Sequence, residues 1–261
     1  CWALHSLPTK YREGSGSSVF SHEMRWYILD LHIHTCLSPC ASLDMAPRTI
    51  AARAKGKGID GLAICDHNTV RNVPALVEAG AREGLTVFGG IEITTREEVH
   101  ILGIFPDEKT LDSMGVLVER GLSMCTDEWM RRDQVIANAD HEVQGFHDKL
   151  LMGATTLSLE ETVSEIHARD GIAISAHADR EGFGLLGQLG FVPPDLKLDA
   201  VELRNSKLIP PELEGYTILA SSDAHEPAQI GDRVTRCFMD TLSFQELFLA
   251  IHSRDGRQIK I

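Results

Sequence analysis

The chain has 261 residues, of which 43% are hydrophobic, so it is long enough to bury a substantial core and is not disordered as a whole. Its formal net charge of -13, from 38 acidic against 25 basic residues, repels a long polyanion and argues against an extended nucleic acid as the partner. A small phosphorylated substrate is compatible with this charge, because bound divalent ions reverse the local potential.

The cysteine pattern and the hydropathy favour a reducing cytoplasm. No apolar run reaches the roughly 18 residues of a membrane span, and no basic segment followed by an apolar one indicates a signal peptide. We therefore expect a cytoplasmic protein with no membrane partner. Residues 1–23 are polar and aperiodic, and we expect a flexible tail there. The cysteines are too scattered for a small disulfide framework: Cys1, Cys36, Cys40, Cys65, Cys125 and Cys237.

From the end of this tail onward, apolar runs of strand length alternate with segments of helical period, which predicts an α/β fold with parallel strands. Roughly seven such units predict a distorted βα barrel, with an open doubly wound sheet as the alternative. The predicted strands are residues 27–33, 61–65, 86–93, 100–105, 172–176, 200–203, 217–220 and 236–239. The predicted helices are one that opens at residues 46–47, then 73–83, 111–120, 159–170 and 243–252.

Residues 123–156 interrupt this alternation. The segment is polar and contains a turn-like Ala-Asp-His at 139–141. We interpret it as an insertion that covers the mouth of the site, within a single domain that spans residues 24–261.

Histidines and carboxylates follow the apolar strands at the points where each strand ends. Alternation in a strand places His32 and His34 on one face, a spacing that suits one metal ion. In a barrel, strand ends on one rim are where catalytic groups collect. A lone strand histidine is most often a packed core residue, but that explanation does not account for all of these positions together. The metal-ligand candidates are His32, His34, His67, Glu92, His100, His177, Asp223 and His225.

Mixed imidazole and carboxylate ligands suit Zn²⁺, Mn²⁺ or Fe²⁺. The candidates exceed the needs of one ion, so we expect two to three divalent ions, with Glu92 as the natural bridge. For the remaining histidines we expect no ligand role, since they lie in tails, polar stretches or helices: His5, His22, His141, His147, His167 and His252.

These motifs resemble the PHP family, the polymerase and histidinol phosphatase domain. The matching segments are HIH at 32–34, DHNT at 66–69, GIE at 90–92 with His100 following, AH at 176–177 and SDAH at 222–225. The resemblance implies a distorted seven-stranded βα barrel that holds up to three divalent ions and hydrolyses phosphate esters.

The resemblance also implies three sets of ligands, one for each ion. His32, His34, Glu92 and Asp223 would hold the first ion, Glu92, His100 and His177 the second, and His67 with His225 the third.

The segment after His34 departs from the family pattern. The position of the family's usual third ligand is occupied by Pro39, which has no donor atom. The substitutes are Asp44 and Cys40, and we favour Asp44, because its carboxylate is ionised at neutral pH. The alternative for Asp44 is a helix N-cap ahead of residues 46–47. For Cys40 the alternatives are a thiolate ligand or, with Cys36 and Cys65, a redox-sensitive site.

For catalysis we expect hydrolysis by a metal-activated hydroxide, without a protein nucleophile. The catalytic candidates are Glu92, Asp66 and Arg180. Arg180 and Arg204 are the candidates for binding the phosphoryl group, because each follows a predicted strand.

The sequence therefore predicts a metal-dependent phosphoesterase with a small phosphorylated substrate, a nucleotide or metabolite monoester. One alternative is an amidohydrolase-type barrel that cleaves C–N bonds, but such sites usually use a lysine bridge, and Glu92 stands in the middle-strand position here. Another is a non-catalytic metal-binding or redox-sensing module. The oligomeric state is left open.

Overall fold

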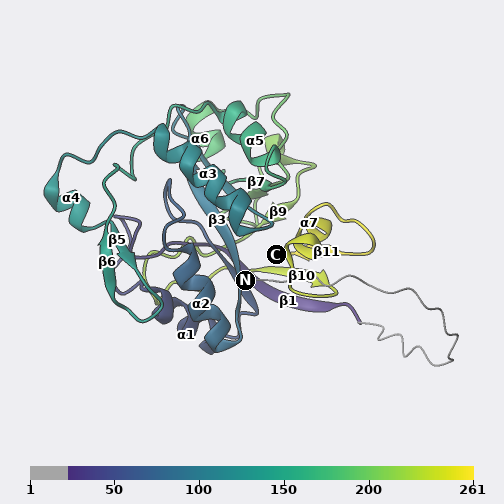
Figure 1. The fold of residues 1–261 in the computed structure, drawn as a ribbon. Helices are drawn as coiled ribbons and strands as arrows, with labels where there is room; N and C mark the ends of the chain where they lie inside the picture. Colours follow the sequence, from purple (N-terminus) through teal and green to yellow (C-terminus); the bar gives the residue numbers. More distant parts are fainter. Residues whose placement is uncertain (1–22) are drawn as a thin grey trace, which may run out of the picture.

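A computed structural model describes residues 23–261, so the tail expected at 1–23 lies almost entirely outside the described residues. Figure 1 shows the arrangement of helices and strands. The strands are β1 (Arg25–Ile33), β2 (Gly61–Ile64), β3 (Thr86–Thr94), β4 (His100–Ile104), β5 (Val135–Ala137), β6 (Val143–Phe146), β7 (Ile172–Ser175), β8 (Ala200–Glu202), β9 (Ile218–Leu219), β10 (Thr235–Met239) and β11 (Gln258–Lys260). The helices are α1 (Pro47–Gly56), α2 (Val73–Glu83), α3 (Glu108–Arg120), α4 (Glu128–Arg132), α5 (Leu159–His167), α6 (Leu185–Leu189) and α7 (Phe244–Ile251), with a 3₁₀ turn at Pro211–Leu213.

The main sheet curls into a nearly closed barrel. Its strand order is β11-β10-β1-β2-β3-β4-β7-β8-β9. Closure comes from the segment after β9, where Asp223 N donates to His32 O (3.0 Å) and His34 N donates to Ala224 O (3.1 Å). The ring β1-β2-β3-β4-β7-β8-β9 is the expected seven-stranded barrel. β10 pairs with the first half of β1, Arg25 to Leu29, and β11 pairs with β10, so these two strands extend the sheet beyond the ring.

Within the seven-stranded ring, one strand runs against the expected parallel order. β4 is antiparallel to both β3 and β7. The connection between β3 and β4 spans only residues 95–99, which is too short for the crossover that a parallel pair requires. As a result His100, the first residue of β4, pairs with Thr94, the last residue of β3. The reversal therefore brings the start of β4 to the same rim as the ends of the parallel strands.

Alternate residues along the strands belong to two different hydrophobic clusters. In β2, Leu62 and Ile64 join a cluster that includes residues of α1, α2, α3 and α5. Ala63 belongs to the second cluster, to which every strand of the barrel contributes, so this cluster fills the barrel interior. Helix α7 adds Leu247 to the interior cluster, on the side of β10.

Capping residues define the ends of two of the helices. Helix α5 begins with a capping box, in which Glu161 N donates to Ser158 Oγ (3.1 Å) and Ser158 N donates to Glu161 Oε2 (2.8 Å). Helix α2 ends at Gly84, whose φ of 64° is in the left-handed region that glycine adopts without strain. No helix among residues 23–261 combines the length and the hydropathy needed to cross a membrane.

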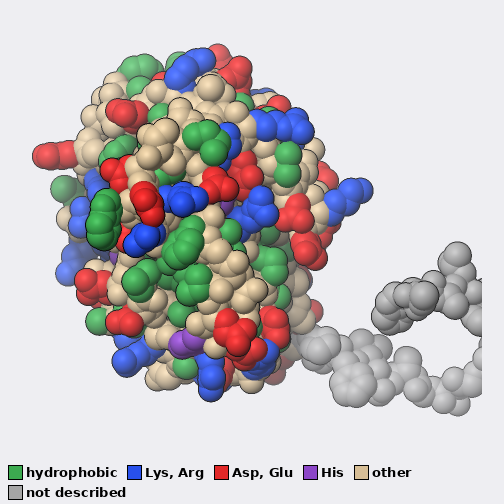
Figure 2. All heavy atoms as spheres, turned by 60° about the vertical axis from the view of Figure 1, so that its left-hand side comes forward, with side chains coloured by type: hydrophobic (Ala, Val, Ile, Leu, Met, Phe, Trp, Pro, Cys, Tyr) green, Lys and Arg blue, Asp and Glu red, His purple; other side chains and the backbone are tan. Residues whose placement is uncertain are grey.

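The segment in which we expect an insertion forms its own small unit of α4 and the two-stranded sheet β5-β6, apart from the main sheet (Figure 1). Figure 2 shows that side of the molecule, where hydrophobic side chains gather among charged side chains of both signs. Trp129, Val143 and Phe146 are among its exposed hydrophobic residues. A hydrogen bond between His147 Nε2 and Glu119 Oε1 (3.1 Å) connects the segment to α3.

Candidate metal centre

The strand ends bring the predicted ligands together at one rim of the barrel. His32 lies on β1, Glu92 on β3 and His100 at the start of β4, and His177 follows β7 by two residues. These four side chains are almost completely inaccessible to solvent. His67, His34, Asp223 and His225 come from the segments that follow β2, β1 and β9.

Two of these residues have unusual backbone conformations. His177 has a φ of 29° and Asp223 a φ of 52°, both in the left-handed region that residues with a side chain rarely adopt. His177 lies two residues after the end of β7, and Asp223 lies four residues after the end of β9. Strained backbone of this kind persists where the surrounding structure holds it and is concentrated at functional sites.

Glu92 occupies the centre of the cluster. Its Oε2 lies 3.0 Å from His67 Nδ1, 3.3 Å from His34 Nε2 and 3.5 Å from His32 Nε2. Its Oε1 faces the other side. The two oxygens of one carboxylate therefore address two sets of histidines, which is the arrangement expected of a bridging ligand.

The second set consists of His100 and His177. Glu92 Oε1 lies 2.8 Å from His100 Nδ1 and 3.2 Å from His177 Nε2. On the side of Oε2, Asp223 Oδ1 lies 3.5 Å from His32 Nε2 and 3.3 Å from His34 Nε2. The groups assigned to the first and second ions by resemblance are thus brought together, and their role as ligands stays a prediction.

Several buried ligand atoms fit bound ions, because they have no hydrogen-bond partner among residues 23–261. Both oxygens of Glu92 and the Nδ1 atoms of His67 and His100 are in this state. An unpaired buried polar atom is costly, and a metal ion would offset that cost. Three compact groups could hold an ion: His32, His34 and Glu92, then His67, Glu92 and His100, then His34, His67 and His225.

The histidines keep the central carboxylates ionised. Burial raises the pKa of Glu92, but the neighbouring His100, His67 and His32 outweigh it and hold the pKa well below its usual range. Burial and repulsion by His67 and His225 lower the pKa of His34. Burial lowers the pKa of His32 and of His67, but the neighbouring carboxylates outweigh it: Glu202 and Glu92 raise the pKa of His32, and Glu92 raises that of His67 to about 10. Metal ligation requires neutral imidazole and ionised carboxylate, so a bound ion would displace protons from these two rings.

Glu202 and Ser38 determine which ring nitrogen of His32 and of His34 carries a proton. His32 Nδ1 lies 3.2 Å from Glu202 Oε1, and a carboxylate accepts, so Nδ1 carries the proton. Ser38 Oγ donates to Asp66 Oδ1 (2.7 Å), so His34 Nδ1 must donate to Ser38 Oγ (3.0 Å). The Nε2 atoms of the two rings lie 3.1 Å apart and face Glu92 and Asp223, and with an ion bound both would present their lone pairs to it.

Asp66, like His32 and His34, does not line the pocket to which Glu92, His177 and Asp223 contribute. It is fully buried, and its carboxylate accepts from Thr35 N (2.7 Å), Thr35 Oγ1 (2.7 Å) and Ser38 Oγ (2.7 Å). Through these three hydrogen bonds Asp66 can orient Ser38 and, through it, His34. We therefore assign Asp66 a positioning role in place of the catalytic one expected from the sequence.

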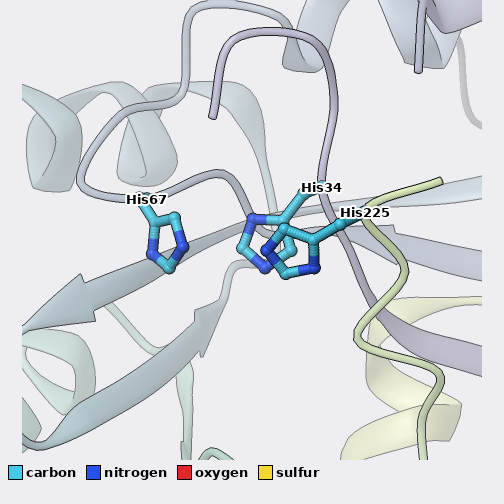
Figure 3. A group of neighbouring side chains, drawn as sticks. All are labelled: His34, His67 and His225. Atoms are coloured by element: carbon cyan, nitrogen blue, oxygen red, sulfur yellow. The ribbon is translucent and has the colours of Figure 1, made fainter. Parts of the chain in front are cut away.

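Toward the outer rim, His67 and His225 form the third group together with the fully buried His34 (Figure 3). Cys40 lines the same pocket. Burial raises the pKa of its thiol, but hydrogen bonds with His225 and His67 outweigh burial and lower the pKa to about 7. Asp44, the ligand favoured from the sequence, is exposed and does not line the pocket.

The pocket has a volume of about 550 Å³ and contains both predicted phosphate-binding arginines, Arg180 and Arg204. It also contains Arg233, which sequence reasoning missed. Arg233 is held in place by Ser221 O, which accepts from Nε at 2.8 Å, and by Ser222 O, which accepts from Nη2 at 2.9 Å. Its place depends on backbone carbonyl groups, so no residue pattern in the sequence announces it.

Glu202 was missed as well, although a signal exists. It stands inside an otherwise apolar strand, after Ala200 and Val201, and a charged residue at a buried strand position needs a partner. Besides binding His32, its Oε1 accepts from His177 N (3.2 Å). Glu202 thus orients ligand residues from two strands.

The histidines for which we expected no ligand role lie elsewhere. His167 and His252 pair with the two oxygens of Asp199, and His147 pairs with Glu119. None of these residues lines the pocket. His5 and His22 lie outside the described residues.

Comparison with known proteins supports the fold and the chemistry. Residues 30–177 match a family model described as the PHP domain, and residues 214–255 match one described as PHP-associated. An uncharacterized protein of Methanocaldococcus jannaschii is 30% identical over 68% of this chain and 81% of its own length. A 5'-3' exoribonuclease of Haemophilus influenzae is 32% identical over 34% of this chain and 32% of its own length. A lesion-specific endonuclease of Pyrococcus furiosus superposes with a TM-score of 0.69 at 20% identity, over 90% of this chain and 58% of its own length.

The chain therefore spans about a third of the exoribonuclease and little more than half of the endonuclease. These findings overturn the expectation that the partner is a small phosphorylated molecule and that an extended nucleic acid is an unlikely partner, because proteins with the matching domain are named as nucleases. Net charge was a poor guide, since it averages over the whole surface, whereas Arg180, Arg204 and Arg233 determine the local field at the pocket. The family match also decides against the C–N hydrolase and the non-catalytic module.

Proposed function

This chain belongs to the PHP domain family of metal-dependent phosphoester hydrolases, and from that premise we propose that it cleaves phosphodiester bonds in nucleic acid strands. One observation carries the proposal. The cluster around Glu92 and three arginines line a single pocket of about 550 Å³. Three arginine side chains are more than one terminal phosphate requires, and they suit successive phosphates of a nucleic acid strand.

The contacts of the three pocket arginines support different roles for them. We assign Arg180 and Arg204 to the phosphate oxygens, because each lines the pocket and neither side chain has an ion-pair partner among residues 23–261. Arg233 donates to the carbonyl groups of Ser221, Ser222 and Arg204, and these contacts hold its positive charge in a fixed position. Fixed charges stabilise a developing negative charge without having to reorganise during the reaction.

The ligand residues would hold the ions in three places. His32, His34 and Asp223 would hold one beside Glu92 Oε2, His100 and His177 one beside Glu92 Oε1, and His67 with His225 the third. When bound, such ions supply Lewis-acid activation of water and of the phosphate. Glu202 and Ser38 keep the histidine lone pairs directed at these places.

The test is an assay of the metal-reconstituted protein on single-stranded RNA and DNA oligonucleotides labelled at the 5' end, with an aryl phosphate monoester in parallel. We expect shortening of the oligonucleotides that requires divalent metal and stops on chelation. Hydrolysis of the monoester with the oligonucleotides left intact would replace nucleic acid with a small substrate. Inactivity on every phosphate ester, at full metal occupancy, would reject the phosphodiesterase itself.

A further inference from the structure

We propose that the thiolate of Cys40 is a ligand of the rim ion, together with His67 and His225, so that this ion is bound through sulfur and nitrogen. The inference concerns metal binding at the site of the proposed function. It is tested without substrate, so its failure is distinguishable from failure of the nuclease proposal.

The loop that carries Cys40 is anchored to both histidines. Ser38, two residues before Cys40, accepts from His67 N (3.1 Å) through its Oγ. Ser42, two residues after it, donates from its N to His225 O (2.8 Å). Ala41 N also donates to Ser38 O (2.8 Å), which closes a turn around Cys40. The backbone is thus held on both sides of Cys40 by the two residues with which it would share an ion.

The two histidines are also prepared for ligation. His225 Nδ1 lies 2.8 Å from Asp223 O, and a carbonyl only accepts, so the proton is on Nδ1 and the Nε2 lone pair is free. His67 is buried, and its Nδ1 faces Glu92 Oε2 at 3.0 Å without a hydrogen-bond partner in the described part of the chain. Nitrogen atoms of these two rings and of His34 lie within 4.8 Å of one another. These features point to a bound ion independently of the cysteine.

Of the pocket carboxylates, Glu92 Oε2 lies 3.0 Å from His67 Nδ1 and Asp223 Oδ1 lies 3.6 Å from His225 Nδ1, but both residues are assigned to the other two ions. Asp44 is exposed and outside the pocket, and Asp66 already accepts three hydrogen bonds from Thr35 and Ser38. Asp232, which lines the pocket, accepts from Lys57 Nζ (3.3 Å).

One thiolate, two imidazoles and an open position form the arrangement of a catalytic zinc site. Thiolate favours Zn²⁺ over Mn²⁺ or Mg²⁺, so the rim ion would differ in kind from the ions beside Glu92.

The first measurement uses the unaltered protein. Metal-free protein is titrated with Co²⁺, and a sulfur-to-cobalt charge-transfer band in the near ultraviolet is expected to grow with one of the bound equivalents. In the same samples, alkylation is followed by peptide mapping with and without Zn²⁺. We expect Zn²⁺ to slow alkylation of Cys40 by at least about tenfold, because a coordinated thiolate is a poor nucleophile. Cys125, which is partly exposed and lies away from the pocket, serves as the internal control and should react at an unchanged rate.

The second measurement compares Cys40→Ser with Cys125→Ser. We expect Cys40→Ser to lose the charge-transfer band and about one zinc equivalent, and Cys125→Ser to retain both. If Cys40→Ser does not fold, the Co²⁺ spectrum of the unaltered protein decides alone. Absence of the band at full cobalt occupancy overturns the proposal, even if Cys40 is shielded from alkylation, since shielding without the band means burial and not coordination.

Discussion

The metal centre has a deep half and a rim half, which are built in different ways. The deep half, His32, His34 and Glu92, comes from β1, β3 and the residue that follows β1, and it is completely buried. The rim half, Cys40, His67 and His225, comes from segments that follow strands and faces the pocket. Sheet register fixes the first, whereas a few turn and loop hydrogen bonds fix the second. We therefore expect the deep ions to be resident and the rim ion to exchange.

The largest effect is expected from the deep half. Glu92→Gln should lower activity by more than about a hundredfold and reduce metal content, because a neutral amide is a poor bridge and even outer-shell changes cost 10- to 100-fold. The barrel interior is untouched, so circular dichroism should be unchanged. Glu83→Gln, at the exposed end of α2, is the control. An active Glu92→Gln protein with a full complement of ions would remove Glu92 from the centre.

The next effect concerns substrate and not metal. Arg180→Met should lower kcat/KM by roughly ten- to a hundredfold, the loss of one charge-assisted contact worth about 1.5 to 3 kcal/mol, and leave the metal content unchanged. Arg53→Met, on the exposed face of α1, is the matched control. Kinetics identical to those of the control would place Arg180 outside the substrate site.

A smaller effect would show how the deep half is held. Glu202→Gln keeps a hydrogen bond to His32 but removes the negative charge, and we expect about tenfold weaker metal binding. Binding is measured by competition with a chelating dye. The rim ion should be insensitive to this change, and equal weakening of all ions would mean that the two halves are not independent.

The smallest effect is expected from Asp44→Asn. Asp44 is exposed and away from the pocket, so metal content and activity should stay within about twofold of the unaltered protein, as for most surface substitutions. Loss of one ion in this variant, with Cys40→Ser unaffected, would return the rim site to the carboxylate favoured from the sequence.

The same contrast explains what could be predicted from the sequence. The barrel class was confirmed, and the strand-borne candidates such as His32 and Glu92 converge, because strand alternation and strand ends are legible in the residue order. The reversal of β4 was missed, although the short 95–99 connection signals it. For the rim, the choice between Asp44 and Cys40 depends on how a loop folds back onto His67 and His225, and loop hydrogen bonds such as Ser42 N to His225 O have no period in the sequence.

Anomalous diffraction from crystals of the metal-loaded protein tests the central claim most directly, namely that Glu92 bridges two ions at the base of the pocket. Data collected at the Mn and Zn absorption edges would place and identify each ion. We expect one peak beside each carboxylate oxygen of Glu92, and a further peak, of zinc, between His67 and His225. Crystals with full metal content in solution but no peak in contact with Glu92 would contradict the account.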